Sequence, residues 1–273
     1  MNPQSRALKV SVDEHVARVE LLGPGPGNAM GPELFAELPR VFGELDDDPQ
    51  VRAIVLHGSG GSFSYGLDLQ TMRGSFEPLL QSPTVTARTS FLREVRELQS
   101  AVTAVADCRT PVVAAIAGWC VGGGVDLAAA TDVRLASADA IFSVREARVA
   151  IVADLGSLQR LVGIIGDGHL RELALTGADV DAERAATIGL VNDVLPDEAG
   201  LLDAADALAR AIAANPPLTV RGIKDVLDAE RAPRVEAGLR YVAAWNAAFA
   251  PSEDLAEAFT AFAERRPARF QGR

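Results

Sequence analysis

Two apolar strands that each end in glycines constrain the fold of this chain most. Residues 51–57 (V-R-A-I-V-L-H) are nearly all apolar and are followed at once by residues 58–61 (G-S-G-G). Residues 111–117 are followed by a second glycine-rich stretch, 118–124, and then by a helical run, 125–130. Short apolar runs bounded by glycine are typical of buried strands in a parallel sheet. The repeated pattern predicts an α/β protein with two turns from strand to helix.

The segments around these strands complete the predicted architecture. Residues 10–22 indicate two short strands, and residues 74–85 indicate a polar loop. Helical spacing of apolar residues over 31–46, and again between 91 and 105, predicts two amphipathic helices. From about residue 201 onward the chain is predicted to be helical almost throughout.

This pattern suggests a division into two regions. We expect a core over residues 1–200 that carries the active site, and a helical region over residues 201–273 that mediates assembly. Two stripes of apolar and aromatic side chains recur in the helical region, namely Leu239, Val242, Trp245 and Phe249, and then Leu255, Phe259 and Phe262. Aromatic stripes on a terminal helical segment favour contacts between subunits.

The composition excludes several classes of protein. The 273 residues carry a formal net charge of −11 without a basic stripe, which argues against nucleic acid as a partner. No apolar run approaches the roughly 20 residues that cross a bilayer, and residues 1–9 do not resemble a signal peptide, so we expect a cytoplasmic protein with no membrane partner. Cys108 and Cys120 are too few for a disulfide framework and lack metal-ligand spacing, so we expect no metal.

The glycine stretches do not match the common nucleotide-binding motifs. They contain neither G-x-G-x-x-G nor the phosphate loop with its lysine. Residues 62–66 (S-F-S-Y-G) approach the nucleophile elbow of serine hydrolases, but serine replaces the first glycine. A turn from strand to helix can instead present a free backbone N–H, and two such groups facing one point form an oxyanion hole for a thioester carbonyl. The alternative is that the glycines only permit close packing of helix on strand.

Three segments together form a specific signature: residues 63–69 (F-S-Y-G-L-D-L), 116–127 (I-A-G-W-C-V-G-G-G-V-D-L) and 158–161 (L-Q-R-L). They resemble the enoyl-CoA hydratase/isomerase (crotonase) superfamily, and the similarity runs over nearly the whole chain. The resemblance implies the crotonase (ClpP-like) fold, an α/β fold of repeated ββα units. It also implies a C-terminal helical region that packs the chain into a homotrimer or a dimer of trimers.

The same resemblance implies an acyl-CoA thioester as the substrate. Coenzyme A is then part of the substrate, and no separate cofactor is needed. The backbone N–H groups of Tyr65 and Gly123 are implied to form the oxyanion hole. The implied substrate-binding residues are Ser64, Tyr65, Gly66, Leu67, Asp68 and Gly123.

The acids around the hole decide the reaction within this superfamily. Asp126 follows Gly123 by one helical turn, and Glu146 and Asp154 come later in the chain. Enoyl-CoA hydratases use glutamates at the positions of Asp126 and Glu146, and usually carry glycine at position 154. The triple of Asp126, Glu146 and Asp154 instead resembles the Δ3,5-Δ2,4-dienoyl-CoA isomerases of fatty acid β-oxidation. This implies that Glu146 exchanges a proton at C2, that Asp154 exchanges one at C6, and that Asp126 orients or tunes them.

The electrostatics of three neighbouring acids lead to a further expectation. Because three carboxyls in one largely apolar pocket cannot all ionise cheaply, at least one of them should hold a proton at neutral pH.

Three alternatives stay open at the level of sequence. The chain could be an enoyl-CoA hydratase that adds water to a 2-enoyl-CoA. Asp154 could simply cap the helix that begins near Ser157, which is a common role for aspartate. Thirdly, the chain could be a non-catalytic scaffold that binds acyl-CoA or RNA, although the net charge of −11 argues against RNA.

Overall fold

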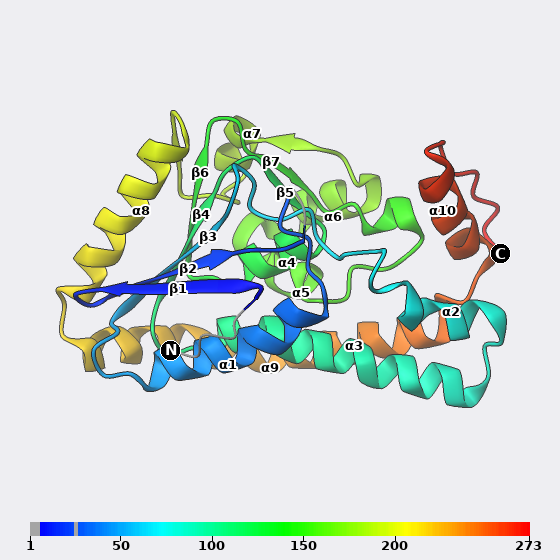
Figure 1. The fold of residues 1–273 in the computed structure, drawn as a ribbon, viewed down its shortest axis with the longest axis horizontal. Helices are drawn as coiled ribbons and strands as arrows, with labels where there is room; N and C mark the ends of the chain where they lie inside the picture. Colours follow the sequence, from blue (N-terminus) through cyan, green and yellow to red (C-terminus); the bar gives the residue numbers. More distant parts are fainter. Residues whose placement is uncertain (1–5, 25–26) are drawn as a thin grey trace.

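A six-stranded sheet forms the centre of the computed structural model, which describes residues 6–24 and 27–273 (Figure 1). The strands lie in the order β1-β2-β3-β4-β6-β9, and every neighbouring pair is parallel except β1 with β2. Their bounds are Leu8–Asp13, Val16–Leu21, Ala53–Gly58, Val112–Ile116, Val133–Ser137 and Asp193–Leu195. The α/β class is confirmed, and the two glycine-bounded strands are β3 and β4.

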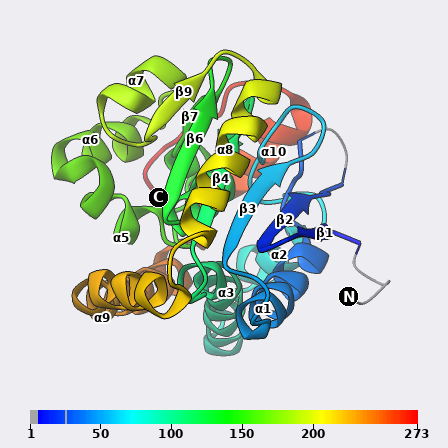
Figure 2. The ribbon, with the colours of Figure 1, turned by 90° about the vertical axis from the view of Figure 1, so that its left-hand side faces the viewer.

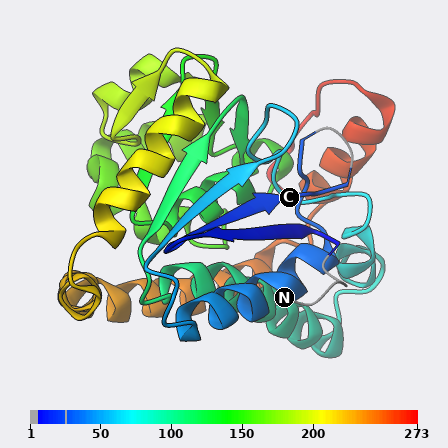
Figure 3. The ribbon, with the colours of Figure 1, turned by 60° about the vertical axis from the view of Figure 1, so that its left-hand side comes forward.

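The central strands direct alternate side chains toward two helical layers. Ile54 of β3 packs in the cluster that contains α1 (Pro32–Asp47) and α3 (Val85–Ala106), whereas Val55 packs against α8 (Glu198–Ala213) on the other face. Successive side chains of a strand point to opposite faces, so a strand between two helical layers is apolar at nearly every position. Figures 2 and 3 show α8 crossing one face of the sheet, with α1 and α3 below.

The predicted polar loop over residues 74–85 is wrong, because residues 73 to 81 form the helix α2 (Arg73–Gln81). Phe76 of this helix is buried and packs against Phe91 of α3, with ring centroids 5.4 Å apart. The few apolar positions of α2 lie among serine, glycine and Pro78, which mask its helical periodicity in the sequence.

The prediction of helix from about residue 201 onward is confirmed, since α8 is followed by α9 (Pro217–Phe249) and α10 (Glu253–Glu264). The division at residue 200 stays a prediction, and α8 takes part in the packing of the central sheet. Of the first predicted stripe, Leu239 and Val242 are buried, whereas Trp245 and Phe249 are 42% and 61% exposed. Among the residues described, no helix is long and apolar enough to span a membrane.

A second, smaller sheet lies next to the glycine-rich turn after β4. Its three strands, in spatial order, are β5 (Trp119–Val121), β7 (Ile141–Ser143) and β8 (Val180–Asp181). Ser64 extends this sheet, because its N–H donates to the carbonyl of Trp119 and its carbonyl accepts from the N–H of Val121, both at 2.9 Å. The remaining helices are α4 (Gly123–Ala129), the 3-10 helix η1 (Glu146–Val149), α5 (Ser157–Arg160), α6 (Val162–Thr176) and α7 (Ala182–Thr187).

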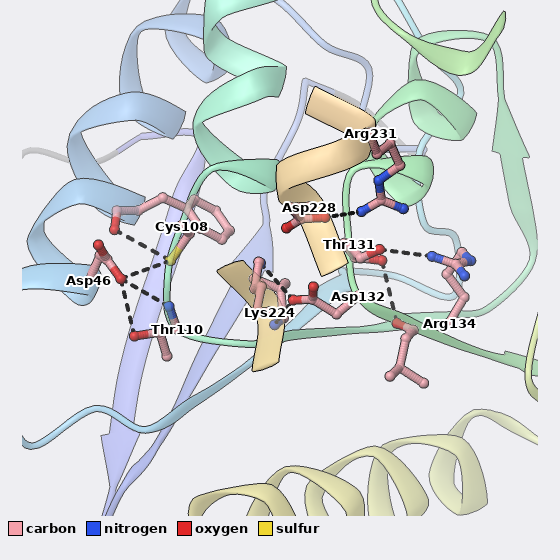
Figure 4. A network of polar contacts seen from close by, with 12 residues as sticks. Asp46, Cys108, Thr110, Thr131, Asp132, Arg134, Lys224, Asp228 and Arg231 are labelled. Carbon is pink, nitrogen blue, oxygen red and sulfur yellow. Dashed lines mark hydrogen bonds and ion pairs between the residues drawn. The ribbon is translucent and has the colours of Figure 1, made fainter. Parts of the chain in front are cut away.

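A polar network fastens the first half of α9 to the sheet (Figure 4). Lys224 of α9 is buried, and its Nζ lies 2.7 Å from Asp132 Oδ2. The same oxygen accepts a hydrogen bond of 2.8 Å from the N–H of Val112, at the start of β4. Nearby, Arg134 Nη1 donates to the carbonyl of Thr131 at 2.8 Å. Buried charges need partners of this kind, so the network fixes the position of α9, which also reaches the site described below.

Candidate active site

The two glycine-rich turns are in direct backbone contact. A β-carbon built on Gly66, which has φ of +82°, would lie 2.5 Å from the carbonyl oxygen of Val121 and 3.1 Å from the nitrogen of Gly123. One built on Gly124 would lie 2.7 Å from the carbonyl oxygen of Ser64. Real β-carbons essentially never come within 3.0 Å of other atoms, so only glycine permits this approach. These glycines therefore serve close packing, and that packing brings the two turns together.

Several backbone N–H groups at this contact have no acceptor in the described part of the chain, and two of them lie next to each other. These two belong to Leu67 and to Gly123, the first residue of α4. A β-carbon built on Gly123 would lie 3.6 Å from the nitrogen of Leu67, which places the two groups side by side. Adjacent free N–H groups, one of them at the start of a helix, can hold a carbonyl oxygen on which negative charge develops.

Tyr65 does not supply one of these donors. Its N–H donates to the carbonyl of Gly27 at 2.7 Å, so the prediction that this group lies in the oxyanion hole is wrong. Leu67 presents the free N–H instead, because the residues on either side of it pair with the backbone of Met30. Tyr65 is 49% exposed, and its ring meets that of Trp119 edge-on, with centroids 6.3 Å apart. Tyr65 therefore contributes a side-chain wall beside the turns.

Ser64 and Asp68 hold the loop in shape. The side chain of Ser64 is completely buried, and its Oγ donates to the carbonyl of Asn28 at 2.8 Å and accepts from the N–H of Gly66 at 3.1 Å. Asp68 Oδ1 accepts from the N–H of Gln70 at 3.0 Å. The predicted contact of Ser64 with substrate therefore does not hold for its side chain.

Asp126, on the first turn of α4, is both a buried acid and a helix cap. It is 1% exposed, and its Oδ1 accepts a hydrogen bond from the N–H of Ser157, the first residue of α5. Burial raises the pKa of Asp126 to about 6, against the opposing effects of Ser157 and the positive charge of Arg160. The alternative that Asp154 caps this helix is wrong. The residue at the cap position is Gly156, and the first N–H of the helix, that of Ser157, donates to Asp126 and not to Asp154.

Glu146 is the first residue of the helix η1, and it lies against the turn before α4. A β-carbon built on Gly122 would lie 3.2 Å from Glu146 Oε1, so the carboxyl lies directly against this turn. Its Oε2 is buried and has no hydrogen-bond partner among the residues described. Burial, followed by repulsion from Asp126 and Asp154, raises the pKa of Glu146 to about 8. A buried carboxyl oxygen without a partner, with a pKa near neutrality, is suited to exchange a proton with a ligand.

Asp154 lies in the segment between η1 and α5. It is partly exposed, and its Oδ2 accepts a hydrogen bond of 2.7 Å from Asn246 Nδ2 on α9. Burial raises the pKa of Asp154 to about 7, with a further rise from Asp126 and an opposing effect of Asn246. The charge of Asp126 thus acts on both Glu146 and Asp154, so the fold brings the three predicted acids into one electrostatic neighbourhood where they titrate as a set.

A small apolar pocket adjoins the segment that links Glu146 to Asp154. Its lining residues come from the loop after the oxyanion N–H groups, from the segment between Glu146 and Asp154, and from α10: Leu69, Val149, Ile151, Ala258, Phe259 and Phe262. The cavity itself is small, about 10 Å³, so its apolar lining marks a surface that a hydrocarbon chain could contact and does not form a ready-made tunnel. No group of three or more metal-ligating side chains occurs in residues 6–24 and 27–273.

Comparison with known proteins identifies the family. The family described as enoyl-CoA hydratase/isomerase matches residues 11–273. The chain belongs to this family. The peroxisomal Delta(3,5)-Delta(2,4)-dienoyl-CoA isomerase of Arabidopsis thaliana is 40% identical, over 96% of this chain and 95% of the relative. The mitochondrial protein of the same name from Dictyostelium discoideum is 38% identical, over 94% of this chain and 87% of the relative. A solved enoyl-CoA hydratase/isomerase structure from Mycobacterium paratuberculosis superposes with a TM-score of 0.82 at 30% identity, covering 95% of this chain and 99% of that one.

Membership of the enoyl-CoA hydratase/isomerase family confirms the resemblance and the crotonase fold predicted from sequence. Two features of the site escaped the sequence interpretation. The free N–H of Leu67 depends on the pairing between Gly27 and Tyr65, which no local pattern reveals. Asn246 continues the buried side of the helix that carries Leu239, and a polar residue at a buried position is the signal that could have marked it.

Proposed function

We propose that this chain isomerises a 3,5-dienoyl-CoA to a 2,4-dienoyl-CoA as part of fatty acid β-oxidation. The observation that carries the proposal is the third carboxyl of the site. Asp154 does not cap α5, accepts its hydrogen bond from a neutral amide, and has its pKa raised to about 7 by burial. A carboxyl with these properties can gain and lose a proton near neutral pH. The names of the two relatives described above support the same reaction.

The reaction removes one proton from C2 of the acyl chain and adds one at C6. The three acids titrate as a set, and the form that reacts is the one with Glu146 ionised and Asp154 protonated. In this form the Glu146 carboxylate removes a proton from C2, and the electron pair of that C–H bond is delocalised over the thioester oxygen and the two double bonds. Protonated Asp154 then donates a proton to C6, and the double bonds come to rest between C2 and C3 and between C4 and C5. The enzyme returns to its starting state when Glu146 loses its proton to solvent and Asp154 takes one up from solvent, so the proton delivered to C6 comes from solvent.

The N–H groups of Leu67 and Gly123 would hold the thioester oxygen while it carries negative charge. One such donor contributes roughly 3–4 kcal/mol to the stability of a transition state. Asp126 would keep the proton affinity of Glu146 high, because its charge opposes ionisation of Glu146. Coenzyme A arrives as part of the substrate, and the proposal needs no other cofactor.

The apolar pocket supports a place for the acyl chain. Val149 and Ile151 lie in sequence between Glu146 and Asp154, so the pocket adjoins the segment that links the two acids. Phe262 of α10 also lines it, and 58% of this residue is exposed. Assembly into a homotrimer or a dimer of trimers stays a prediction, as does the cytoplasmic location.

The direct test is to mix the purified protein with a 3,5-dienoyl-CoA and follow the strong near-ultraviolet absorbance of a conjugated 2,4-dienoyl thioester. The proposal expects this band to grow with multiple turnovers. Crotonyl-CoA, a 2-enoyl thioester, is the matched substrate for hydration. Absence of the dienoyl band together with loss of crotonyl-CoA absorbance would replace the isomerase with a hydratase.

The hydratase alternative rests on Asp126 and Glu146, which occupy the positions of the two hydratase glutamates. The geometry disfavours it, because Asp126 is 1% exposed and its Oδ1 is already bonded to the N–H of Ser157. This acid is therefore poorly placed to hold a water molecule. Three acids with raised pKa values also argue against a non-catalytic scaffold.

A further inference from the structure

The segment that carries Asp154 is held by two buried side-chain amides from different helices. It runs from Ala150 to Gly156, and both of these end residues have positive φ, +57° and +133°. Gln99 of α3 is 1% exposed and Asn246 of α9 is 2% exposed. A side-chain amide has both donors and an acceptor, so the set of partners fixes which way it points.

Gln99 contacts only the backbone of this segment. Its Nε2 donates to the carbonyl of Asp154 at 2.7 Å and to the carbonyl of Leu239 at 3.0 Å. Its Oε1 accepts from Arg96 at 3.0 Å. Gln99 thus fixes the segment against α9 without contacting the carboxylate of Asp154.

Asn246 contacts both the backbone and the carboxylate. Its Nδ2 donates to Asp154 Oδ2 at 2.7 Å and to the carbonyl of Val152 at 2.8 Å, while its Oδ1 accepts from the N–H of Val152 at 3.4 Å. Both N–H bonds of Nδ2 are used. Reversing the amide would set its oxygen against two acceptors, so the orientation follows from the contacts.

We propose that Asn246 is a positioning residue that reserves Oδ2 of Asp154 as an acceptor, so that Oδ1 is the oxygen that carries and delivers the proton. An N–H donor that faces Oδ2 excludes a proton from that oxygen, because two donors cannot face each other across a hydrogen bond. The inference deepens and rests on the proposed function, in which Asp154 exchanges its proton with C6 of the acyl chain.

The charged groups around Asp154 do not replace this donor. Asp126 of α4 opposes the ionised form of Asp154, and Asp154 in turn opposes that of Glu146 on η1. On α3 and α9, Arg96 Nη2 and Glu236 Oε1 pair with each other at 2.8 Å.

On α5, Arg160 is turned to other partners, the carbonyl of Leu155 at 3.2 Å and Thr103 Oγ1 at 3.0 Å. Asn246 is therefore the main group that stabilises ionised Asp154, and its removal should raise the pKa of Asp154.

The test is the pH dependence of isomerisation by Asn246→Leu, which removes the donor and keeps a similar volume. The rate requires protonated Asp154, so the alkaline limb of kcat should move up by about one pH unit. The weaker acid should lower kcat about ten-fold with KM changed less than about two-fold. The matched control is Asn215→Leu, at an exposed position just after α8, which should leave the profile unchanged.

Gln99→Met separates positioning of the proton from positioning of the segment. It should lower kcat without moving the alkaline limb, because Gln99 does not contact the carboxylate. If Asn246→Leu does not fold, Asn246→Ala should shift the limb in the same direction by a smaller amount. An unchanged limb in a folded Asn246 variant, or an equal shift in Gln99→Met, would overturn the inference.

A second measurement keeps this inference separate from the proposed function. The pKa of Asp154 can be followed by carbon-13 NMR of protein labelled at the aspartate carboxyls, with Asp154→Asn assigning the signal. A higher pKa in the Asn246 variants supports the contact's role even if the wild-type protein forms no dienoyl product. Absence of that product overturns the proposed function, and an unchanged pKa overturns the role of Asn246.

Discussion

Replacing Gly66 by alanine tests whether contact between the two turns places the oxyanion donors. Gly66 has φ of +82°, and its β-carbon would lie 2.5 Å from the carbonyl oxygen of Val121 and 3.1 Å from the nitrogen of Gly123. The left-handed backbone costs alanine about 1–2 kcal/mol, and relief of the overlap costs about 1–3 kcal/mol. The free energy of unfolding should therefore fall by about 2–5 kcal/mol.

Activity should fall more steeply than stability in this variant. Relief of the overlap must separate residue 66 from Val121 and Gly123, and that movement also separates the N–H groups of Leu67 and Gly123. Loss of one oxyanion donor lowers kcat about 100-fold to 1000-fold. We therefore expect at least about a 100-fold loss of kcat at a temperature where the variant is fully folded.

Variants at two other glycines separate the cost of the left-handed backbone from the cost of the contact. Gly60 has φ of +65° but nothing within 4 Å of a built β-carbon, so Gly60→Ala should lose stability and retain activity. Gly124 lies in α4, and its β-carbon would lie 2.7 Å from the carbonyl oxygen of Ser64, so Gly124→Ala isolates the effect of contact. The assays are urea unfolding and initial rates on a 3,5-dienoyl-CoA. The reasoning is refuted if Gly66→Ala matches Gly60→Ala in both assays.

Three further predictions follow, two from the acids and one from the apolar pocket. Asp126→Asn keeps an acceptor for the N–H of Ser157 and removes a charge that raises the pKa of Glu146, so the acid limb of the rate profile should move to lower pH. The pKa values of Asp126, Asp154 and Glu146 are raised to about 6, 7 and 8, so their favourable contribution to stability is complete below pH 4 and is lost as the pH rises through 6 to 8. The melting temperature should fall over that range, and Glu146→Gln should reduce the fall. Phe262→Ala should raise KM for long acyl chains more than for short ones, as measured with a series of chain lengths.

The sequence predicted the features that depend on local pattern. The strands β3 and β4 were visible because both of their faces are buried, which makes almost every residue apolar. The three acids were identified through their surrounding motifs, and the structure brings them into one electrostatic neighbourhood. Family membership followed from the same segments.

The features that the sequence did not predict depend on contacts between distant segments. The N–H of Tyr65 is engaged because the carbonyl of Gly27 lies 2.7 Å away, and this pairing makes Leu67 the free donor. Asp126 of α4 caps α5, although it lies 31 residues before Ser157 in the chain. The sequence near Ser157 therefore does not reveal this role.

The central claim is that two carboxyls exchange protons at opposite ends of the dienoyl system, and isotope exchange in deuterated water tests it most directly. Wild-type protein should form 2,4-dienoyl-CoA with deuterium at C6, as read by NMR. Asp154→Asn should still exchange the C2 hydrogens of the 3,5-dienoyl-CoA through Glu146, but it should form almost no product. Product labelled at C6 and formed by Asp154→Asn at the wild-type rate would contradict the account.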